Sequence, residues 1–172
     1  MQNIPSVDLR DFLSENPERK QKFVNEIGKA FEEIGFVALK GHFLDDRLVD
    51  DLYSEVRQFF ALPVEVKEKY EIPGIGGQRG YVSFGKEHAK GRKEGDLKEF
   101  WHFGQYVDET SRWKDEYPDN VEVTELPKFN EIGKEAYKML EKTGVYVLRA
   151  LALHLGLDEK YFDEYAYEGN SI

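Results

Sequence analysis

The sequence contains no cysteine among its 172 residues. Disulfides, thiolate metal sites, iron–sulfur clusters and cysteine nucleophiles are therefore excluded. Long apolar runs are also missing: the richest, Val145 to Leu157, is interrupted by Arg149 and His154, and none approaches the ~18 residues of a membrane span. The segment from Met1 to Asp11 has no apolar run typical of a signal peptide. We therefore predict a cytoplasmic protein with no membrane partner.

Basic residues are fewer than acidic ones, with 24 Lys and Arg against 34 Asp and Glu and a formal net charge of −10. A general nucleic-acid binder needs a positive surface for phosphates, and the basic residues here are interleaved with acids, as in Lys86 to Lys98. We therefore expect no nucleic-acid partner. The acidity indicates a soluble surface, and the 40% of hydrophobic residues suffice for the core of one domain or most of one.

Hydrophobic spacing predicts the elements of the first half of the chain. A helix should begin at Asn16-Pro17, because Asn caps free amides and Pro tolerates the first helical position, and Gly35 should end it. The other predicted elements are a strand at 4–9, a strand at 36–39, a helix from Asp45 to Phe60 and a short helix from Pro63 to Tyr70.

The second half should contain two short strands, at 81–84 and 98–103, and then the longest helix, from Thr124 to Leu155. Gly133 and Gly144 weaken this helix, which leaves a kink or a break open. Gly156 should end it, and Asp158 should cap one more helix, which ends at Tyr165. The fold class is α+β, with too few strands to close a sheet or barrel, so the helices need an external sheet to cover.

The four histidines predict no metal site. A two-His, one-carboxylate iron site usually begins with a His and an acid two residues apart on a strand. The residues two positions after His42, His88, His102 and His154 are Leu44, Lys90, Gly104 and Gly156. His154 and Asp158 have helical spacing, but Gly156 breaks the helix between them. No metal ligand and no catalytic residue is predicted within the chain.

The glycine-rich stretch Pro73 to Gly80 (PGIGGQRG) is superficially similar to a phosphate-binding loop. Such a loop needs a Lys followed by Ser or Thr at a helix start, and Arg79-Gly80-Tyr81 stands there instead. We interpret the stretch as a flexible loop near a pocket. Ser83 lacks the first glycine of a Gly-x-Ser-x-Gly nucleophile elbow, so we interpret it as a strand serine.

Several segments, in order, resemble the isopenicillin N synthase-like oxygenases, which depend on non-haem iron(II) and 2-oxoglutarate. IPSVDLRDF resembles their opening strand, and the stretch from FEEIGF to VKEKY resembles the helix, Gly-Phe strand and helix that follow, the last ending in Phe-Phe-x-Leu-Pro. RGYVSFGKE and KEFWHFG resemble the segments that lead toward the active-site mouth. The resemblance covers essentially the whole chain, and one small departure is Gly41-His42 where His-Gly is usual.

The resemblance implies two regions: 1–123, the N-terminal region of the dioxygenase, and 124–172, a long backing helix with the entry to the core. Both would pack on a double-stranded β-helix (jelly roll) that is largely missing from this chain. Fe(II) and 2-oxoglutarate are the implied cofactors. Their ligands, a His-x-Asp, a distal His and an Arg, are expected beyond Ile172, and Glu168 to Ile172 resembles the entry to the first barrel strand.

The implied activity is oxidation of a small molecule by hydroxylation, desaturation or ring closure, with the present chain inactive by itself. The candidate substrate-binding residues are Arg79, Tyr81 and His102. The family's arginine in this segment can pair with a substrate carboxylate; the competing interpretations are a surface arginine, a core tyrosine and a packed histidine. A second hypothesis is a stand-alone, non-catalytic interaction module, and the downstream coding region would distinguish the two. The sequence indicates neither the substrate nor the oligomeric state, and oxidation without 2-oxoglutarate, as some relatives perform, stays open.

Overall fold

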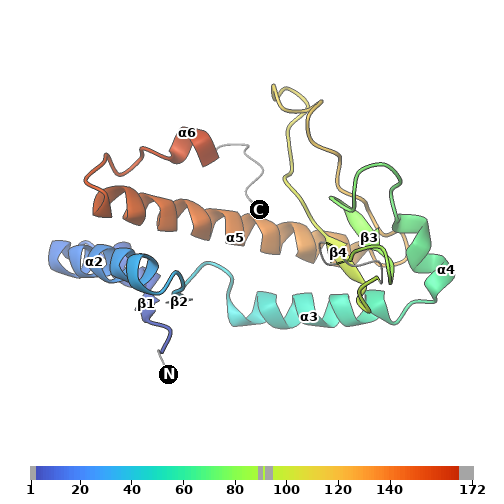
Figure 1. The fold of residues 1–172 in the computed structure, drawn as a ribbon, viewed down its shortest axis with the longest axis horizontal. Coiled ribbons are helices and arrows are strands. Elements are labelled where there is room, and N and C mark those ends of the chain that lie inside the picture. The colour runs from blue at the N-terminus through green and yellow to red at the C-terminus, as the bar shows by residue number, and fades with distance from the viewer. Residues whose placement is uncertain (1–2, 89–90, 92–94, 167–172) are drawn as a thin grey trace. The chain divides into compact units, whose positions relative to one another are not determined.

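The structure is a computed structural model that describes residues 3–88, 91 and 95–166 (Figure 1). The chain divides into two compact units. Of the described residues, unit 1 contains those up to Asp45 and those from Lys138 to Ala166, and unit 2 contains those from Asp46 to Tyr137. The boundaries of these units are set by packing within each unit. The regions 1–123 and 124–172 were instead drawn from the family resemblance, and they stay a prediction. No helix of the described residues is long and apolar enough to cross a membrane.

Unit 1 begins with β1 (Ser6–Asp8), α1 (Leu9–Phe12), α2 (Pro17–Glu33) and β2 (Ala38–Lys40). The two strands pair in parallel, with Ser6 opposite Ala38. Asn16 caps α2 as predicted, because its side-chain oxygen accepts from the amides of Glu18 at 2.9 Å and Arg19 at 3.3 Å. Gly35 ends the helix in the left-handed region (φ 78°), which confirms the predicted C-terminal cap.

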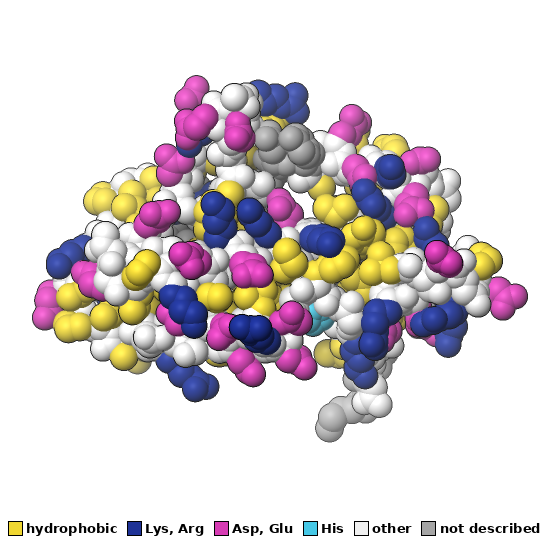
Figure 2. All heavy atoms as spheres, turned by 180° about the vertical axis from the view of Figure 1, so that it is seen from behind, with side chains coloured by type: hydrophobic (Ala, Val, Ile, Leu, Met, Phe, Trp, Pro, Cys, Tyr) yellow, Lys and Arg dark blue, Asp and Glu magenta, His cyan; other side chains and the backbone are white. Residues whose placement is uncertain are grey.

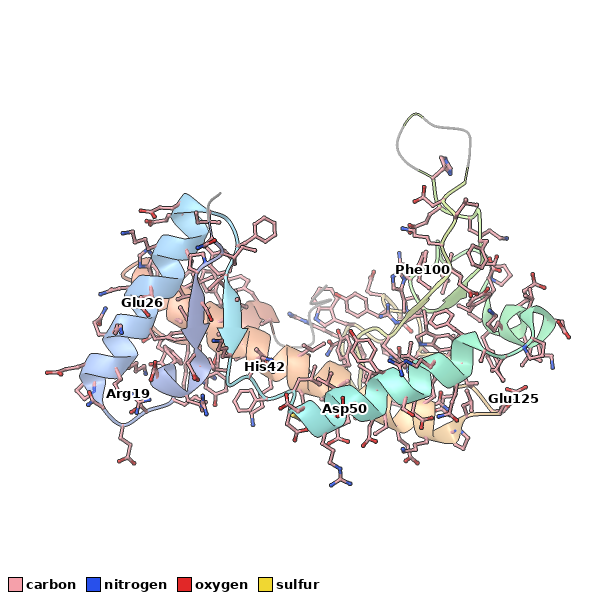
Figure 3. All side chains as sticks on the ribbon, turned by 90° about the horizontal axis from the view of Figure 1, so that it is seen from below. Arg19, Glu26, His42, Asp50, Phe100 and Glu125 are labelled. Carbon is pink, nitrogen blue, oxygen red and sulfur yellow. The ribbon has the colours of Figure 1, made fainter. Side chains whose placement is uncertain are left out.

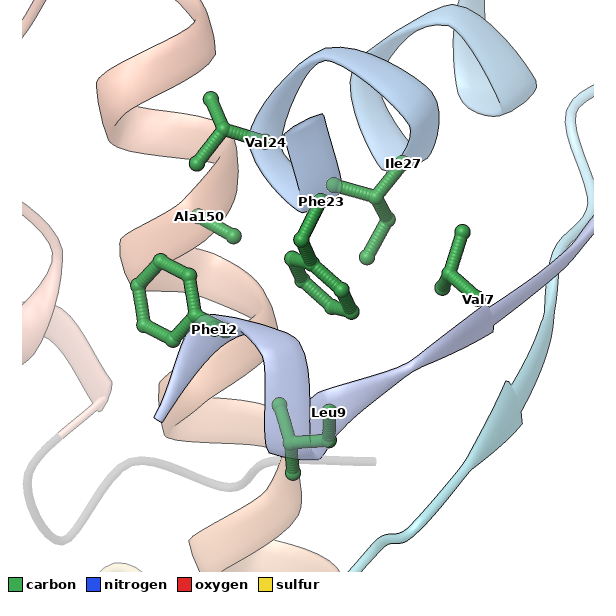
Figure 4. Packing of buried hydrophobic residues seen from close by; sticks show 7 residues of the cluster. All are labelled: Val7, Leu9, Phe12, Phe23, Val24, Ile27 and Ala150. Atoms are coloured by element: carbon green, nitrogen blue, oxygen red, sulfur yellow. The ribbon is translucent and has the colours of Figure 1, made fainter. Parts of the chain in front are cut away.

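The core of unit 1 lies between α1, α2, β1 and the C-terminal part of α5 (Pro127–His154), as Figure 4 shows. Phe23, Val24 and Ile27 share one face of α2 because their spacing matches the helical period. The ring of Phe23 lies 5.6 Å from that of Phe12. The remaining buried members of this cluster are Val7, Leu9 and Ala150.

The segment after α5 differs from the prediction. Gly156 ends α5 with φ 73° as expected, but Asp158 does not begin a helix; α6 spans Asp163–Ala166. The Asp158 carboxylate accepts from the amide of Lys160, two residues on, at 2.9 Å, and this local turn competes with helix formation. Glu168 to Ile172, the predicted entry to a barrel strand, lies outside the described residues.

Unit 2 contains α3 (Asp46–Phe60), α4 (Val64–Lys67), the 3-10 helix η1 (Glu68–Tyr70), β3 (Gly80–Val82), β4 (Phe100–His102) and the N-terminal part of α5. Both predicted strands are present, but they are shorter than the expected 81–84 and 98–103, and they pair in antiparallel orientation. An aromatic cluster is the core of this unit. Phe59 is at its centre, with its ring 4.8 Å from that of Trp101 and 5.1 Å from that of Phe129; Tyr70 and Tyr81 are the other buried aromatic members.

Helix α5 is continuous through both of its glycines, so neither breaks it. Gly133 faces the aromatic cluster: a Cβ at this position would lie 2.0 Å from the ring of Phe103. Gly144 faces open space, with no atom within 4 Å of such a Cβ. The first glycine therefore admits an aromatic ring close to the helix backbone, whereas the second has no such role.

Alanine substitutions at these two glycines should have opposite effects on the free energy of unfolding. Gly133→Ala should lower it by about 2 kcal/mol, because Phe103 must leave its packed position. Gly144→Ala, the matched control in the same helix, should raise it by up to about 1 kcal/mol through helix propensity. Urea denaturation followed by circular dichroism measures both. Equal effects would show that the Phe103 contact is unimportant for stability.

Candidate functional site

The two-stranded ribbon of β3 and β4 has a core face and an open face. Tyr81 pairs with Trp101 across the strands, and both rings join the aromatic cluster. Because side chains alternate along a strand, the neighbours Val82, Phe100 and His102 belong to the other face. Phe100, labelled in Figure 3, lies on this ribbon, away from Asp50 of α3. The open face is the part of unit 2 where side chains of β4 are available to a ligand.

A buried ionic network fixes the core side of the ribbon. Lys67, only 3% exposed, lies with its Nζ 2.7 Å from a Glu99 carboxylate oxygen. The Tyr81 hydroxyl donates to the same oxygen at 2.5 Å, and Lys67 also donates to the carbonyl of Phe60 at 3.3 Å. Burial opposes ionisation of Glu99, but the bonds from Lys67 and Tyr81 outweigh it and lower the pKa of Glu99. The network joins α3, α4 and β3 to the residue before β4.

Tyr81 therefore lies in the core of unit 2. Its side chain is 1% exposed, and burial together with the bond to Glu99 raises the pKa of its phenol. In this position it supports the strand from behind, and its predicted part in substrate binding stays a prediction.

Arg79 is also buried, at 3% exposure, although it precedes β3 in the glycine-rich stretch. Its Nη1 donates to the carbonyl of Gln78 at 2.7 Å, while Nε and Nη2 have no hydrogen-bond partner among the described residues. The guanidinium packs on Gly104, where a Cβ would lie 1.8 Å from Cζ. Burial lowers the pKa of Arg79, opposed by the nearby hydroxyls of Tyr137, Tyr106 and Tyr117. A desolvated guanidinium of this kind is stabilised when an anionic group binds beside it.

His102 lies on the open face and is exposed. Its Nδ1 is 2.5 Å from the carbonyl oxygen of Gly77, and its ring lies 4.8 Å from that of Phe100. Of the three candidate residues, His102 alone presents a side chain to solvent; Arg79 and Tyr81 lie behind the ribbon surface. The sequence pattern could not predict which of the three is exposed, because each is a polar or amphipathic residue in or beside a predicted strand.

The glycine-rich stretch lines a cavity of about 310 Å³. Its walls include Pro73, Gly77 and Val82, with Lys86 and Glu87 also lining it. Gly74, Gly76 and Gly77 all have positive φ, so the tight loop needs glycine there. The expected loop near a pocket is thus present. The sequence pattern did not indicate that Lys86 and Glu87 line this cavity. Lys86 pairs with Glu71 at 3.2 Å, and Glu87 pairs with Lys98 at 2.6 Å.

The described residues do not fit an iron site, since they include no group of three or more His, Asp or Glu side chains that could hold a metal. His154 and Asp158 are engaged separately. The Nε2 of His154 lies 3.0 Å from a Glu32 oxygen, and its ring packs against Gly28, whereas Asp158 caps the Lys160 amide. No chemical step through iron is derived from these residues.

The Lys67–Glu99 pair should be a major source of stability in unit 2. Glu99→Gln should lower the free energy of unfolding by about 3 kcal/mol at neutral pH, because it leaves the buried Lys67 unpaired. Since the folded-state pKa of Glu99 is lowered, this contribution is complete above the ordinary carboxyl range, near ~4.3. It is lost as the pH falls through the lowered folded value.

Urea denaturation at a series of pH values measures this difference between wild type and variant. The matched control is Glu87→Gln, which removes the exposed pair with Lys98 and should change stability by about 0.5 kcal/mol or less. A difference between wild type and Glu99→Gln that stays constant into acid would contradict the assignment.

Replacing Arg79 tests whether its guanidinium is compensated within the chain. Arg79→Met should leave the free energy of unfolding unchanged or raise it by about 1 kcal/mol, because a buried donor without a partner is costly. Arg149→Met is the control. Arg149 binds Asp163 through two bonds, of 3.0 and 2.7 Å, and its loss should cost about 1 kcal/mol. If Arg79→Met is the more damaging change, the guanidinium makes stabilising contacts in the folded chain.

Three comparisons with known proteins relate this architecture to a family. Residues 4–125 match the family described as non-haem dioxygenase in morphine synthesis N-terminal. The 2-oxoglutarate-dependent dioxygenase frbA of Dothideomycetidae sp. (strain 11243) is 30% identical over 169 residues, which are 90% of this chain and 48% of that protein. A 2OG-Fe(II) oxygenase family protein from Caulobacter crescentus has a solved structure that superposes with a TM-score of 0.86 at 35% identity, covering 99% of this chain and 54% of that one.

A further solved relative, JOX2, was crystallised with 2OG, Fe and JA; it is 25% identical, with a TM-score of 0.68, and the match covers 98% of this chain and 45% of that one. The chain thus spans about half the length of the curated relatives it matches. Iron and 2-oxoglutarate are the cofactors of this group of oxygenases, as the resemblance implied. From the match over 4–125 and the shared fold, this chain belongs to the non-haem dioxygenase N-terminal family, among the 2-oxoglutarate-dependent oxygenases.

Proposed function

We propose that this chain is the N-terminal part of a non-haem iron(II), 2-oxoglutarate-dependent oxygenase that oxidises a small molecule by hydroxylation, desaturation or ring closure. The observation that carries the proposal is the near-complete alignment of the chain with about half of an oxygenase structure at a TM-score of 0.86. The described residues hold no metal-binding group, and we expect the iron ligands of such a protein in the half that this chain does not match.

The small sheet of unit 1 supports a jelly-roll core as the missing part. Within the described residues, β1 and β2 form a sheet of only two strands, paired in parallel. Parallel strands are usually part of larger, covered sheets, and two strands leave open edges with free amides and carbonyls. An adjoining strand from a β-helix core would satisfy these groups.

Exposed apolar side chains in unit 1 are also consistent with a missing partner layer. Leu155, Tyr161 and Tyr165 are 62%, 47% and 67% exposed, and Figure 2 shows hydrophobic side chains gathered among charged ones on one face of the molecule. Large exposed apolar groups often mark interaction surfaces. We therefore expect the isolated chain to bind apolar dyes or to self-associate.

Within the proposed oxygenase, this chain supplies the substrate side of the site. His102 presents its imidazole on the open face of the β3–β4 ribbon, and the buried Arg79 would attract a substrate carboxylate if the tyrosines around it moved aside. Tyr81 holds the strand from the core. The substrate is a small molecule, and the net charge of −10 disfavours nucleic acid.

The alternative function is a stand-alone, non-catalytic interaction module derived from the same family. The lack of a metal-binding group among the described residues is the observation that favours it. The coding region after Ile172 separates the two: a reading frame with His-x-Asp, a later His and an Arg supports the oxygenase, and a stop codon supports the module.

The proposal is tested by comparing the chain with the longer product of the same reading frame. Under anaerobic conditions the longer protein should bind Fe(II) and 2-oxoglutarate together, and with oxygen it should convert 2-oxoglutarate to succinate. The 172-residue chain should do neither, because its described residues bring no ligand set together. Equilibrium dialysis of Fe(II) with 2-oxoglutarate checks the first point. Tight stoichiometric binding by the short chain, or none by the longer protein, would refute the proposal.

A further inference from the structure

The imidazole of His102 is held in one orientation by the backbone of the glycine-rich stretch. Its Nδ1 lies 2.5 Å from the carbonyl oxygen of Gly77. A carbonyl oxygen can only accept a hydrogen bond, so Nδ1 must carry the proton. In the neutral ring the lone pair is then on Nε2. This assigns the less common tautomer to a histidine on a strand surface.

The position of the Gly77 carbonyl is itself fixed by the fold. Gly77 has φ 75°, in the left-handed region, and a Cβ there would lie 2.8 Å from Cγ2 of Val82. Only glycine therefore fits between the loop and β3. The same residue lines the cavity of about 310 Å³, whereas His102 and Phe100 are not among the described residues that line it.

The remaining nitrogen of His102 is available to a ligand. Among the described residues, no side chain or backbone group bonds Nε2, and the side chain is exposed. The neighbouring Phe100 ring, 4.8 Å away and tilted by 53°, restricts rotation of the imidazole and adds an apolar surface beside it. A histidine oriented through Nδ1–H to a carbonyl, with Nε2 open, is the arrangement seen for imidazoles that accept bonds or bind metals.

A metal is not the ligand these residues fit, because no further His, Asp or Glu of the described residues completes a metal-binding group with His102. One cation on this face, Lys98, lies over the Phe100 ring at 5.2 Å and is paired with Glu87 at 2.6 Å. In the neutral ring, the lone pair of Nε2 would repel an anion. A hydrogen-bond donor is the ligand chemistry that suits this lone pair.

We propose that His102 is a specificity-determining residue that accepts, through Nε2, a hydrogen bond from an O–H or N–H group on an apolar ring of the substrate. This inference rests on the proposed function for the identity of the ligand as a substrate. The ring would lie against Phe100 while its donor meets Nε2. Analogues that lack the donor cannot form this bond and leave Nε2 without a partner beneath the bound ring.

The tautomer is tested first, on the 172-residue chain labelled with ¹⁵N-histidine, at about pH 8.5 where imidazoles are neutral. Long-range ¹⁵N–¹H spectra should show His102 with a protonated Nδ1 and a bare Nε2, unlike the exposed His42 and His88. His102→Gln assigns the signals. Gly77→Ala should displace the carbonyl and mix the tautomers, whereas Gly76→Ala, also at positive φ (61°) but facing open space, should not. A protonated Nε2 in the wild type would overturn the proposal.

The ligand chemistry is tested with phenol and anisole, two similar rings of which only phenol carries a donor. Titration with phenol should move the Nε2 resonance of His102, and anisole should leave it in place. Equal shifts from both probes, or shifts of the same size at His42 and His88, would mean adventitious contact only and would overturn the inference. Neither measurement needs iron or 2-oxoglutarate, so its failure is separable from failure of the proposed oxygenase activity.

Discussion

The buried pair of Lys67 and Glu99 is the interaction on which the candidate site depends. Glu99 precedes β4, Lys67 ends α4, and Tyr81 of β3 donates to the same carboxylate. A buried ion pair is tolerated when its groups make further hydrogen bonds; here Lys67 also donates to the Phe60 carbonyl, and Glu99 also accepts from the Tyr81 hydroxyl. The position of the ribbon relative to α4 is thereby fixed, and with it the face that carries His102.

Close packing at glycines complements this ionic network. Gly133 of α5 admits the ring of Phe103, Gly104 admits the guanidinium of Arg79, and Gly80 passes so near the Tyr70 carbonyl that a Cβ would lie 2.4 Å from it. In each case a bulky group occupies space that a methyl group would fill. The aromatic core therefore reaches the backbone of the ribbon and of α5, which limits how far either can move.

Much of the fold could be predicted from local rules. The Asn16 cap, the Gly35 and Gly156 ends and the two strands were readable because short-range chemistry determines them. Asp158 was misjudged because the same carboxylate can cap a helix or close a turn two residues on. The site was harder to predict. Nothing in the sequence distinguishes the exposed His102 from the buried Arg79 and Tyr81. Their exposure depends on long-range contacts with Gly77, Gly104 and Glu99.

In the proposed oxygenase, these contacts assign substrate binding to this chain and the iron centre to the rest of the protein. A histidine that binds a ligand in one orientation needs a rigid support. Strand β4 provides this support because its core-facing side chain, Trp101, packs in the aromatic cluster. Iron ligands need the same rigidity, but the described residues bring no such group together. In such a protein the β3–β4 ribbon would face the substrate, and the iron would be bound by another sheet. Loop residues of this chain could then vary without changing the iron site. Substrate choice and oxygen chemistry would then be properties of separate parts of one protein.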